Sequence, residues 1–390
     1  MGPLQGVRVV EFAGIGPGPF AAMLLADMGA DVIRIDRAAA VGRDKDPHYS
    51  PTLRNRPSIA IDLKHADGRE TALALIDKAD ILLEGFRPGV MERLDLGPDL
   101  VHARNPRLVY GRMTGWGQDG PIAHTAGHDI NYIALSGALH AIGTADRGPV
   151  PPLNLVGDFG GGALYLVTGV LAALIEARTS GKGQVIDVSM VEGAASLMTM
   201  FYGLLASANA GSGGERAWKE AREANFLDGG SHYYNVYETA DGRHICIGSI
   251  EPQFYQLLLA TVGLTDDDLG PQNERGQWPQ NREKLAAVFK RKTQAEWTEI
   301  MSDTDICFAP VLAMSEAPHH PHNAARSSFI EVAGVTQPGP APKFSRTILA
   351  TPAPPAHAGE NTVEALGAWG FNEKTIAQLV ESGAVRQRRG

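Results

Sequence analysis

Cysteine is nearly absent from this sequence of 390 residues, which holds only Cys246 and Cys307. Two thiols cannot frame a disulfide scaffold, and they fit a reducing compartment in which cysteine behaves as a small apolar residue. The N-terminus lacks the basic start, apolar run and cleavage site of a secretory signal peptide. The C-terminal segment 385–390 lacks a peroxisomal signal of the Ser-Lys-Leu type. We therefore expect a cytoplasmic protein.

Positive charge is also scarce, because 35 lysines and arginines stand against 44 aspartates and glutamates, which gives a formal net charge of −9. A nucleic-acid-binding protein needs a basic face to neutralise phosphates, so this balance excludes nucleic acid as a bulk partner. It still allows a local basic pocket for a small anionic molecule.

No apolar run reaches the length of a membrane span. The longest uncharged stretch extends from Phe159 to Ile175, which is 17 residues, and it includes several glycines. A helix that crosses a bilayer needs about 20 apolar residues. We therefore expect a buried core helix here and no membrane span.

The composition is that of a folded protein, with 44% apolar and 20% charged residues, and the length is too great for one small core. Residues 7–12 form a β-branched run, residues 20–28 have helical spacing, and residues 31–35 form a second β-branched run. This order is typical of a βαβ unit with parallel strands. The same alternation continues with strands at 58–63, 81–84, 108–113 and 185–189 and with helices at 68–78, 159–178 and 192–206.

The fold class that this pattern predicts is α/β: a Rossmann-like open parallel sheet in a large domain, plus a smaller α+β domain. The Gly/Ser-rich and then charged segment 207–230 indicates a boundary, and residues 233–250 read as a hairpin around Asp241-Gly242. A proline-rich linker at 337–356 precedes an amphipathic helical tail at 360–382. We predict a large domain (1–190), linker helices (191–230), a small domain (231–330), and a linker with a C-terminal segment (331–390) that returns to the large domain.

The turn after the first strand has part of a dinucleotide-binding fingerprint. Gly14 and Gly16 follow the strand, and Asp36 ends the next one, but the third glycine position holds Pro19. Prolines also remove backbone donors from a loop that would cradle pyrophosphate. A tight Gly/Pro turn is therefore favoured over a nicotinamide site.

Basic residues gather at the ends of the predicted strands and in the loops that follow them. Such loops meet at one edge of a doubly wound sheet, where ligands bind, and arginines suit a phosphorylated ligand. A solvated charged surface explains the set about equally well. The set comprises Arg37, Arg54, Arg56, Lys64, Arg87 and Arg93.

Three acidic or basic positions attract attention on chemical grounds. His128, beside an aspartate in an apolar stretch, can titrate near neutral pH, or it can simply cap a helix from Asn131 to Leu139. Asp158 precedes a long apolar helix and reads as its N-cap, where free N–H groups near Gly157 to Gly160 can stabilise an enolate oxygen. Glu251 before Pro252 reads as an ordinary helix start.

Several segments together carry a resemblance to a known family, from about residue 3 to beyond residue 345. The chain resembles the class III CoA-transferase superfamily and, within it, the α-methylacyl-CoA racemases. The motifs GHDINY and PPLNLVGDFGGG favour the racemases over the transferases. The other segments are VRVVEFAGIGPGPFAAMLLADMGADVIRIDR, SIAIDLK, RPGVMERLDLGP, RMTGWGQDGP, SGKGQVIDVSMVEG, LDGG, IGSIEPQFY and PAPKFSRT.

The resemblance implies a racemase that interconverts (2R)- and (2S)-2-methylacyl-CoA thioesters. It implies that His128 and Asp158 are the two acid/base residues, and that Glu251 from the neighbouring subunit orients the histidine side. It also implies an interlocked homodimer and no cofactor, since CoA is part of the substrate, and no metal. The implied CoA-binding positions are Arg37, Ile61, Asp62, Leu63, Lys64, Arg93, Gly127, His128, Asp129, Ile130, Asn131 and Tyr132.

Two alternatives remain open on the sequence. In a CoA transferase, Asp158 would be a nucleophile that forms a mixed anhydride and then an enzyme–CoA thioester. A non-catalytic acyl-CoA-binding protein would need the basic cluster alone. The chain also departs from close relatives at Gly229–His232 and in a long segment at 212–222, which leaves the acyl-chain preference open.

Overall fold

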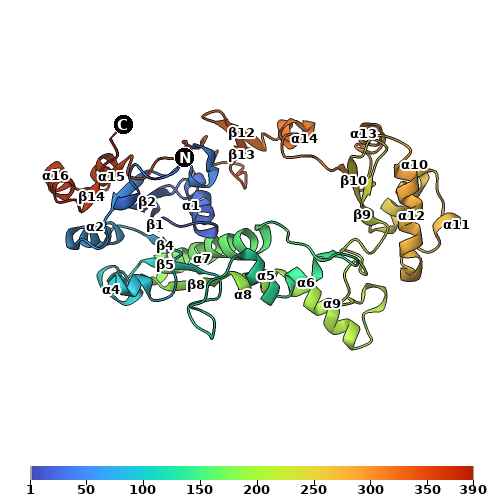
Figure 1. Cartoon of the computed structure of the whole chain (residues 1–390), viewed down its shortest axis with the longest axis horizontal. Helices are drawn as coiled ribbons and strands as arrows, with labels where there is room; N and C mark the ends of the chain where they lie inside the picture. Colours follow the sequence, from blue (N-terminus) through green and yellow to red (C-terminus); the bar gives the residue numbers. More distant parts are fainter. Residues whose placement is uncertain (1, 390) are drawn as a thin grey trace. The chain divides into compact units, whose positions relative to one another are not determined.

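The structure is a computed structural model that describes residues 2–389, and the chain divides into two compact units. The first unit consists of Met1–Ile133, Asn154–Ser196 and Pro318–Gly390, and the second consists of Ala134–Leu153 and Leu197–Ala317. Each unit has a sheet of its own (Figure 1). The chain therefore leaves the first unit twice and returns to it twice.

A seven-stranded sheet forms the centre of the first unit, in the order β14-β3-β2-β1-β4-β5-β8. All neighbours pair in parallel except β14, which runs antiparallel to β3. The strand order reverses at β1, which creates a crevice at the carboxyl ends of β1 and β4. The predicted α/β class with an open, mostly parallel sheet is confirmed. The strands are β1 (Arg8–Phe12), β2 (Asp31–Arg37), β3 (Ser58–Ile61), β4 (Ile81–Glu84), β5 (Val109–Thr114), β8 (Val185–Ser189) and β14 (Val385–Arg386).

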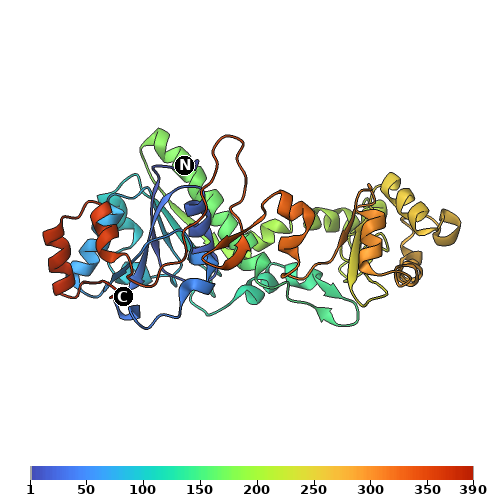
Figure 2. The same cartoon turned by 90° about the horizontal axis from the view of Figure 1, so that it is seen from above.

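Helices cover both faces of this sheet, because its strands are apolar on both sides. One face packs Val10, Ile59 and Leu82 against α2 (Ala66–Ile76), α4 (Pro98–Arg104), α15 (Thr362–Ala368) and α16 (Glu373–Glu381). The other face packs Val9, Ile81 and their neighbours against α1 (Pro17–Asp27) and α7 (Leu164–Ser180). Figure 2 shows the red C-terminal helices on one side of the sheet and the green α7 on the other.

The long apolar segment Leu155–Ser180 has the length and composition of a membrane span. Its α-helical part, α7, places Leu166, Val170 and Leu174 in the same core cluster as the sheet residues. This packing accounts for the buried face of α7, as the sequence predicted for a core helix, whereas Leu164 and Ile175 are exposed.

Two predicted helices are each broken in two. The expected helix 192–206 is α8 (Met190–Leu197) followed by α9 (Thr199–Asn209), because Met198 leaves the helical region at φ −86° and ψ 3°. The expected tail 360–382 is α15 and α16, separated at Gly370, which has a positive φ of 86°. The short edge strand β14 that follows α16 was not predicted.

The second unit contains the predicted hairpin, made of β9 (Tyr234–Glu238) and β10 (His244–Gly248). A third strand, β11 (Phe308–Pro310), pairs with β10 on the edge opposite β9. Gly242 in the turn has a positive φ of 75°, which glycine adopts without strain. The core of this unit contains Tyr255, Phe289 and Trp297. The helices around it are α10 (Pro252–Val262), α11 (Asp266–Leu269), α12 (Trp278–Phe289) and α13 (Gln294–Met301).

Candidate functional site

A cavity of about 840 Å³ opens in the first unit where the strand order reverses. Ligands bind at this position in doubly wound sheets, because the loops after neighbouring strands diverge there. Most of the lining comes from the ends of strands and the loops that follow them: residues 11–19 at β1, residues 36, 37 and 40 at β2, residues 83–88 at β4 and residues 113–116 at β5. The rest of the lining is Ala123, residues 125–128, Tyr132, Asn154, Asp158 and Met190.

The Gly/Pro turn after β1 forms one wall of the cavity. Gly16 has a positive φ of 70°, and α1 begins at Pro17 directly after it. A Cβ atom at Gly16 would lie 3.1 Å from Oδ2 of Asp158, so only glycine lets this backbone come so close to the carboxylate. The predicted tight turn is confirmed, and it faces Asp158.

The basic cluster predicted from the sequence separates into three groups. Arg37 and Arg87 line the cavity, whereas Lys64 and Arg93 are exposed outside its lining. Arg54 and Arg56 are buried as structural ion pairs. Nη2 of Arg54 lies 2.5 Å from Oδ2 of Asp27, and Nε of Arg56 lies 3.4 Å from Oε2 of Glu11. These two arginines are therefore wrong as candidates for binding a phosphorylated ligand.

His128 directly precedes α5 (Asp129–Leu135). This helix begins two residues earlier in the chain than the predicted start at Asn131. The Asn131 side chain accepts a hydrogen bond from the His128 backbone N–H at 3.0 Å, which fixes the start of the helix. The Tyr132 hydroxyl donates to the carbonyl of Gly127. A Cβ atom at Gly127 would lie 2.7 Å from the Tyr132 ring, so the backbone before His128 needs glycine.

Asp158 lies in the first turn of a π-helical segment, Leu155–Ala163, that leads into α7. The N-cap position belongs to Asn154, so the prediction that Asp158 is the N-cap is wrong. The glycine run explains the difference. A Cβ atom at Gly161 would lie 2.5 Å from the backbone of Ala194, and this close packing holds the wider helical turns.

The backbone N–H of Asp158 is not free to bind an enolate oxygen. It donates to Oδ1 of Asp129 at 2.7 Å. Of the amides predicted to bind the enolate between Gly157 and Gly160, this one is therefore excluded.

The pKa of the Asp158 carboxyl is raised above its ordinary value. The main cause is burial, and the negative charge of Asp129 adds to it. A hydrogen bond of 3.0 Å from Nδ2 of Asn154 and the positive charge of protonated His128 act in the opposite direction. The carboxyl therefore holds its proton more firmly than an exposed aspartate does.

The residues implied to bind CoA are only partly brought together. Arg37, Gly127, His128 and Tyr132 line the cavity with Asp158. Within residues 2–389, its lining excludes Ile61–Lys64, Arg93 and Asp129–Asn131. The Ile61 side chain lies in the core, and its strand pairs with β2 so that Ile61 is beside Arg37.

Glu251 lies in the second unit, immediately before α10, with Pro252 as the first helical residue. This is the predicted helix start. The Glu251 side chain is exposed and makes no capping hydrogen bond to the helix.

Two of the residues that depart from close relatives at Gly229–His232 are core residues of the second unit. Ser231 and His232 are fully buried. Nε2 of His232 lies 2.7 Å from the Tyr255 hydroxyl, and burial lowers the pKa of His232 to about 4. Both residues therefore belong to the core of the second unit, and the acyl-chain preference stays open.

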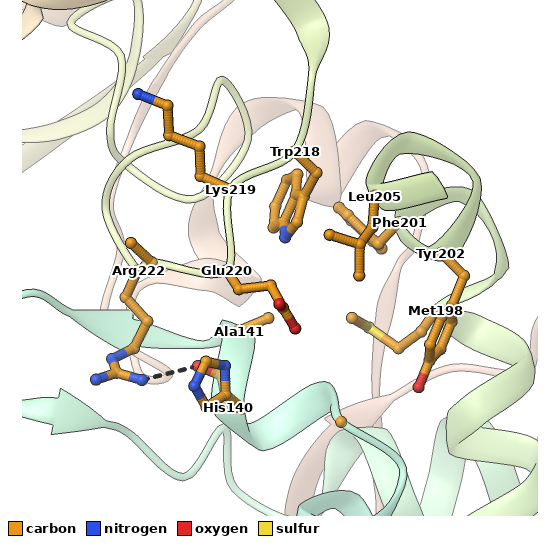
Figure 3. Close-up of a pocket in the computed structure, with 12 residues that line it drawn as sticks. His140, Ala141, Met198, Phe201, Tyr202, Leu205, Trp218, Lys219, Glu220 and Arg222 are labelled. Carbon is orange, nitrogen blue, oxygen red and sulfur yellow. Dashed lines mark hydrogen bonds between the residues drawn. The ribbon is translucent and has the colours of Figure 1, made fainter. Parts of the chain in front are cut away.

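A smaller cavity of about 130 Å³ lies within the second unit (Figure 3). Met198, Phe201 and Leu205 approach it from one side, and Trp218 from another. The Phe201 and Trp218 rings pack edge to face at 4.8 Å between centroids. Residues 218–222 of the long segment thus line an apolar cavity, and Arg222 closes it by donating to the carbonyl of His140.

Sequence reasoning missed two carboxylates beside the main cavity. Glu11 is buried at the end of β1, and burial raises its pKa despite the nearby Arg56. Glu84 at the end of β4 accepts a hydrogen bond from Nε of Arg112 at 2.8 Å. The sequence does hold a signal for both, because each is an acidic residue near the end of a largely apolar strand, in VRVVEF and in ILLE.

The CoA-transferase family III matches residues 4–362 of this chain. The chain belongs to this family. Its relatives include the α-methylacyl-CoA racemase of Mus musculus, which is 46% identical over 382 residues and covers 96% of each chain. The α-methylacyl-CoA racemase of Homo sapiens is 44% identical over 395 residues, which is 98% of this chain and 99% of the human protein.

Relatives named as transferases are more distant. An acyl-CoA transferase of Fusarium pseudograminearum is 31% identical over 98% of this chain and 88% of its own. Among solved structures, a protein of Mycobacterium tuberculosis has a TM-score of 0.76 at 26% identity, covering 93% of this chain and 98% of its own. A CaiB/BaiF family protein of Brucella suis has a TM-score of 0.77 at 23% identity, covering 94% and 99%, and supports the fold alone.

Proposed function

We propose that this chain is a racemase that interconverts the (2R) and (2S) epimers of 2-methylacyl-CoA thioesters. The relatives with 44–46% identity over nearly the whole chain are named as such racemases, which favours this activity over CoA transfer. The structural observation that carries the proposal is that His128 and Asp158 line one cavity together with Arg37 and Arg87.

The reaction needs two acid/base groups, because the proton leaves one face of the α-carbon and another proton arrives on the opposite face. In one direction, neutral His128 takes the α-proton and protonated Asp158 donates. In the other direction, the carboxylate takes the proton and the imidazolium donates. Each well-placed group contributes roughly 10²–10⁴-fold to the rate. The raised pKa of Asp158 suits this exchange, because the carboxyl must hold a proton in half of the cycle.

Two arginines in the lining of the cavity suit the nucleotide end of CoA. Arg37 and Arg87 provide guanidinium groups that bind phosphate through paired hydrogen bonds. The other implied positions, Ile61–Lys64, Arg93, Ile130 and Asn131, lie outside the lining of this cavity, and we propose that they bind parts of CoA that extend beyond it. No step requires a metal or a redox cofactor, since CoA is part of the substrate.

We propose further that the active unit is a homodimer in which Glu251 of one chain orients His128 of the other. The exposed Glu251 carboxylate makes no capping bond to its own helix, so it is free to accept a hydrogen bond from an imidazole. Large apolar side chains such as Ile175, Met200 and Tyr202 are exposed on the chain, which suits an interface.

A cytoplasmic location agrees with two free cysteines.

The main alternative is a CoA transferase in which Asp158 attacks the thioester. That role requires Asp158 to react as the carboxylate, and its raised pKa lowers the fraction of carboxylate at a given pH. This mechanism also gives His128 no part in the chemistry.

The test is to incubate the protein with (2R)-2-methylacyl-CoA in D₂O and to follow the α-hydrogen by NMR. Deuterium incorporation with loss of optical purity is the expected result. Transfer of CoA to an added carboxylic acid without α-exchange would establish the transferase instead. Absence of both reactions would leave a binding protein.

A further inference from the structure

We propose that Asp129 is a positioning residue that joins the two acid/base groups and holds Asp158 by its backbone. This inference rests on the proposed function of His128 and Asp158. It assigns to Asp129 a role other than contact with CoA.

The first observation is the direct connection between the two segments. Asp129 follows His128 in the chain, and its Oδ1 accepts the backbone N–H of Asp158 at 2.7 Å. One side chain therefore fixes the distance between the start of α5 and the turn that carries Asp158. A displacement of about 1 Å at a reacting group can cost roughly 10²-fold in rate.

The second observation is that the structure makes room for this carboxylate. Asp129 is only 6% exposed, and its Oδ2 is buried with no hydrogen-bond partner among residues 2–389. A Cβ atom at Gly157 would lie 2.6 Å from Oδ1 of Asp129, so glycine at position 157 is what admits the side chain. A buried carboxylate with one unsatisfied oxygen costs stability, which a purely structural hydrogen bond would not require.

The third observation concerns charge. The groups that act electrostatically on Asp158 are His128 and Asp129, both from the α5 segment, while Asn154 contributes a neutral amide. The pKa of Tyr132 in α5 is raised mainly by burial and also by the negative charges of Asp158 and Asp129, against the positive charge of Arg87. The backbone of Gly16, directly before α1, lies beside the Asp158 carboxylate. Burial is the main cause of the raised pKa of Asp158, and Asp129 is the negative neighbour that adds to it.

The substitution Asp129→Asn separates charge from shape, because the amide oxygen still accepts the Asp158 N–H. The pH dependence of kcat/KM should report the titration of the His128–Asp158 pair. In Asp129→Asn, the low-pH limb is expected to move to lower pH in both directions, with KM for the thioester unchanged. Asp99→Asn, an exposed aspartate of α4, is the matched control for loss of one charge and should leave the profile unmoved.

The substitution Gly157→Ala tests the positioning by pushing on Asp129 without changing any charge. We expect kcat to fall roughly 10- to 100-fold while KM changes little. Circular dichroism establishes that each variant is folded. An unmoved pH limb in Asp129→Asn together with wild-type kcat in Gly157→Ala would overturn the inference. A raised KM for the thioester with an unmoved limb would also overturn it, in favour of a CoA contact.

A titration that does not depend on activity separates this inference from the proposed function. In protein labelled with ¹³C at aspartate carboxyls, the Asp158 signal is assigned from its loss in Asp158→Asn. Its titration should move to lower pH in Asp129→Asn. If the wild-type protein catalyses no exchange but this shift occurs, the proposed function fails and the link between Asp129 and Asp158 stands. If exchange occurs and the shift does not, the inference alone fails.

Discussion

At the scale of single residues, the chemistry of Asp158 depends on its surroundings more than on its type. An exposed aspartate would be ionised at neutral pH and could not donate a proton. Here burial and the nearby charge of Asp129 raise its pKa, against the opposing effects of Asn154 and His128. A carboxyl that holds its proton more firmly can donate a proton in one direction and accept one in the other, which is what a reaction that runs in both directions requires.

The two-base mechanism predicts different behaviour for each single variant. In Asp158→Asn, epimerisation should fall by about 10²–10⁴-fold, while His128 still washes deuterium from D₂O into one epimer only. In His128→Asn, the other epimer should exchange. The measurement is NMR of the α-hydrogen, begun separately from the pure (2R) and (2S) thioesters.

The transferase alternative predicts otherwise. There Asp158→Asn would lose all turnover, and His128→Asn would keep it. Exchange into both epimers by either variant would contradict the assignment of one group to each face.

His232 leads to a prediction about stability. Its pKa is about 4 in the folded protein and about 6.5 when it is exposed in the unfolded chain, because burial disfavours the charged imidazole. Between these values the unfolded chain binds the extra proton, so folded stability falls as pH is lowered from about 6.5 to about 4. The loss amounts to roughly 3 kcal/mol when it is complete.

The substitution His232→Gln should remove this contribution, because glutamine does not titrate. We expect the difference in free energy of unfolding between variant and wild type to shrink as pH falls from 7 to 4, measured by urea unfolding at each pH. A difference that stays constant with pH would show that His232 does not titrate as its burial implies.

At the scale of elements, the last residues of the chain complete the first unit. β14 pairs with β3 through Val385 and Ile61, and Leu366, Trp369 and Leu379 lie in the same core cluster as the sheet. The C-terminal helices are thus part of the fold that holds Arg37 on the neighbouring β2, and are not an independent tail.

The substitution Trp369→Ala should therefore destabilise the first unit by about 3–5 kcal/mol, the usual cost of removing a large buried aromatic ring. The matched variant Trp218→Ala removes a buried ring from the second unit instead. Hydrogen exchange measured by mass spectrometry should show faster exchange in β3 and α2 for Trp369→Ala only. Equal effects of both variants on β3 would contradict the assignment.

Long sequence patterns predicted the elements of this fold, and short ones did not. The β1–α1–β2 unit and the β9–β10 hairpin were predictable because several consecutive residues carry the period and the turn. The two-residue β14 carries too few residues for any period, and the π-helical turns at Leu155–Ala163 depend on close packing against Ala194. The hydrogen bond from the Asp158 backbone N–H to Asp129 joins positions 29 residues apart. It depends on tertiary structure, so no local motif predicts it.

At the scale of the whole molecule, the path of the chain matters for the proposed assembly. The second unit is inserted twice between parts of the first, and each unit has its own hydrophobic core. Glu251 belongs to one unit, and His128 and Asp158 belong to the other. A dimer in which these groups meet across the interface therefore needs both chains for each active site.

A complementation experiment tests this arrangement directly. Homodimers of His128→Ala and of Glu251→Ala should each be nearly inactive. A heterodimer that carries one copy of each, isolated with two different affinity tags, holds one site with both residues intact and one site with neither. We expect it to recover about half of wild-type epimerase activity, because one of its two equivalent sites is complete. If Glu251 acted within its own chain, every site would lack one of the two residues, and the heterodimer would remain as inactive as its parents.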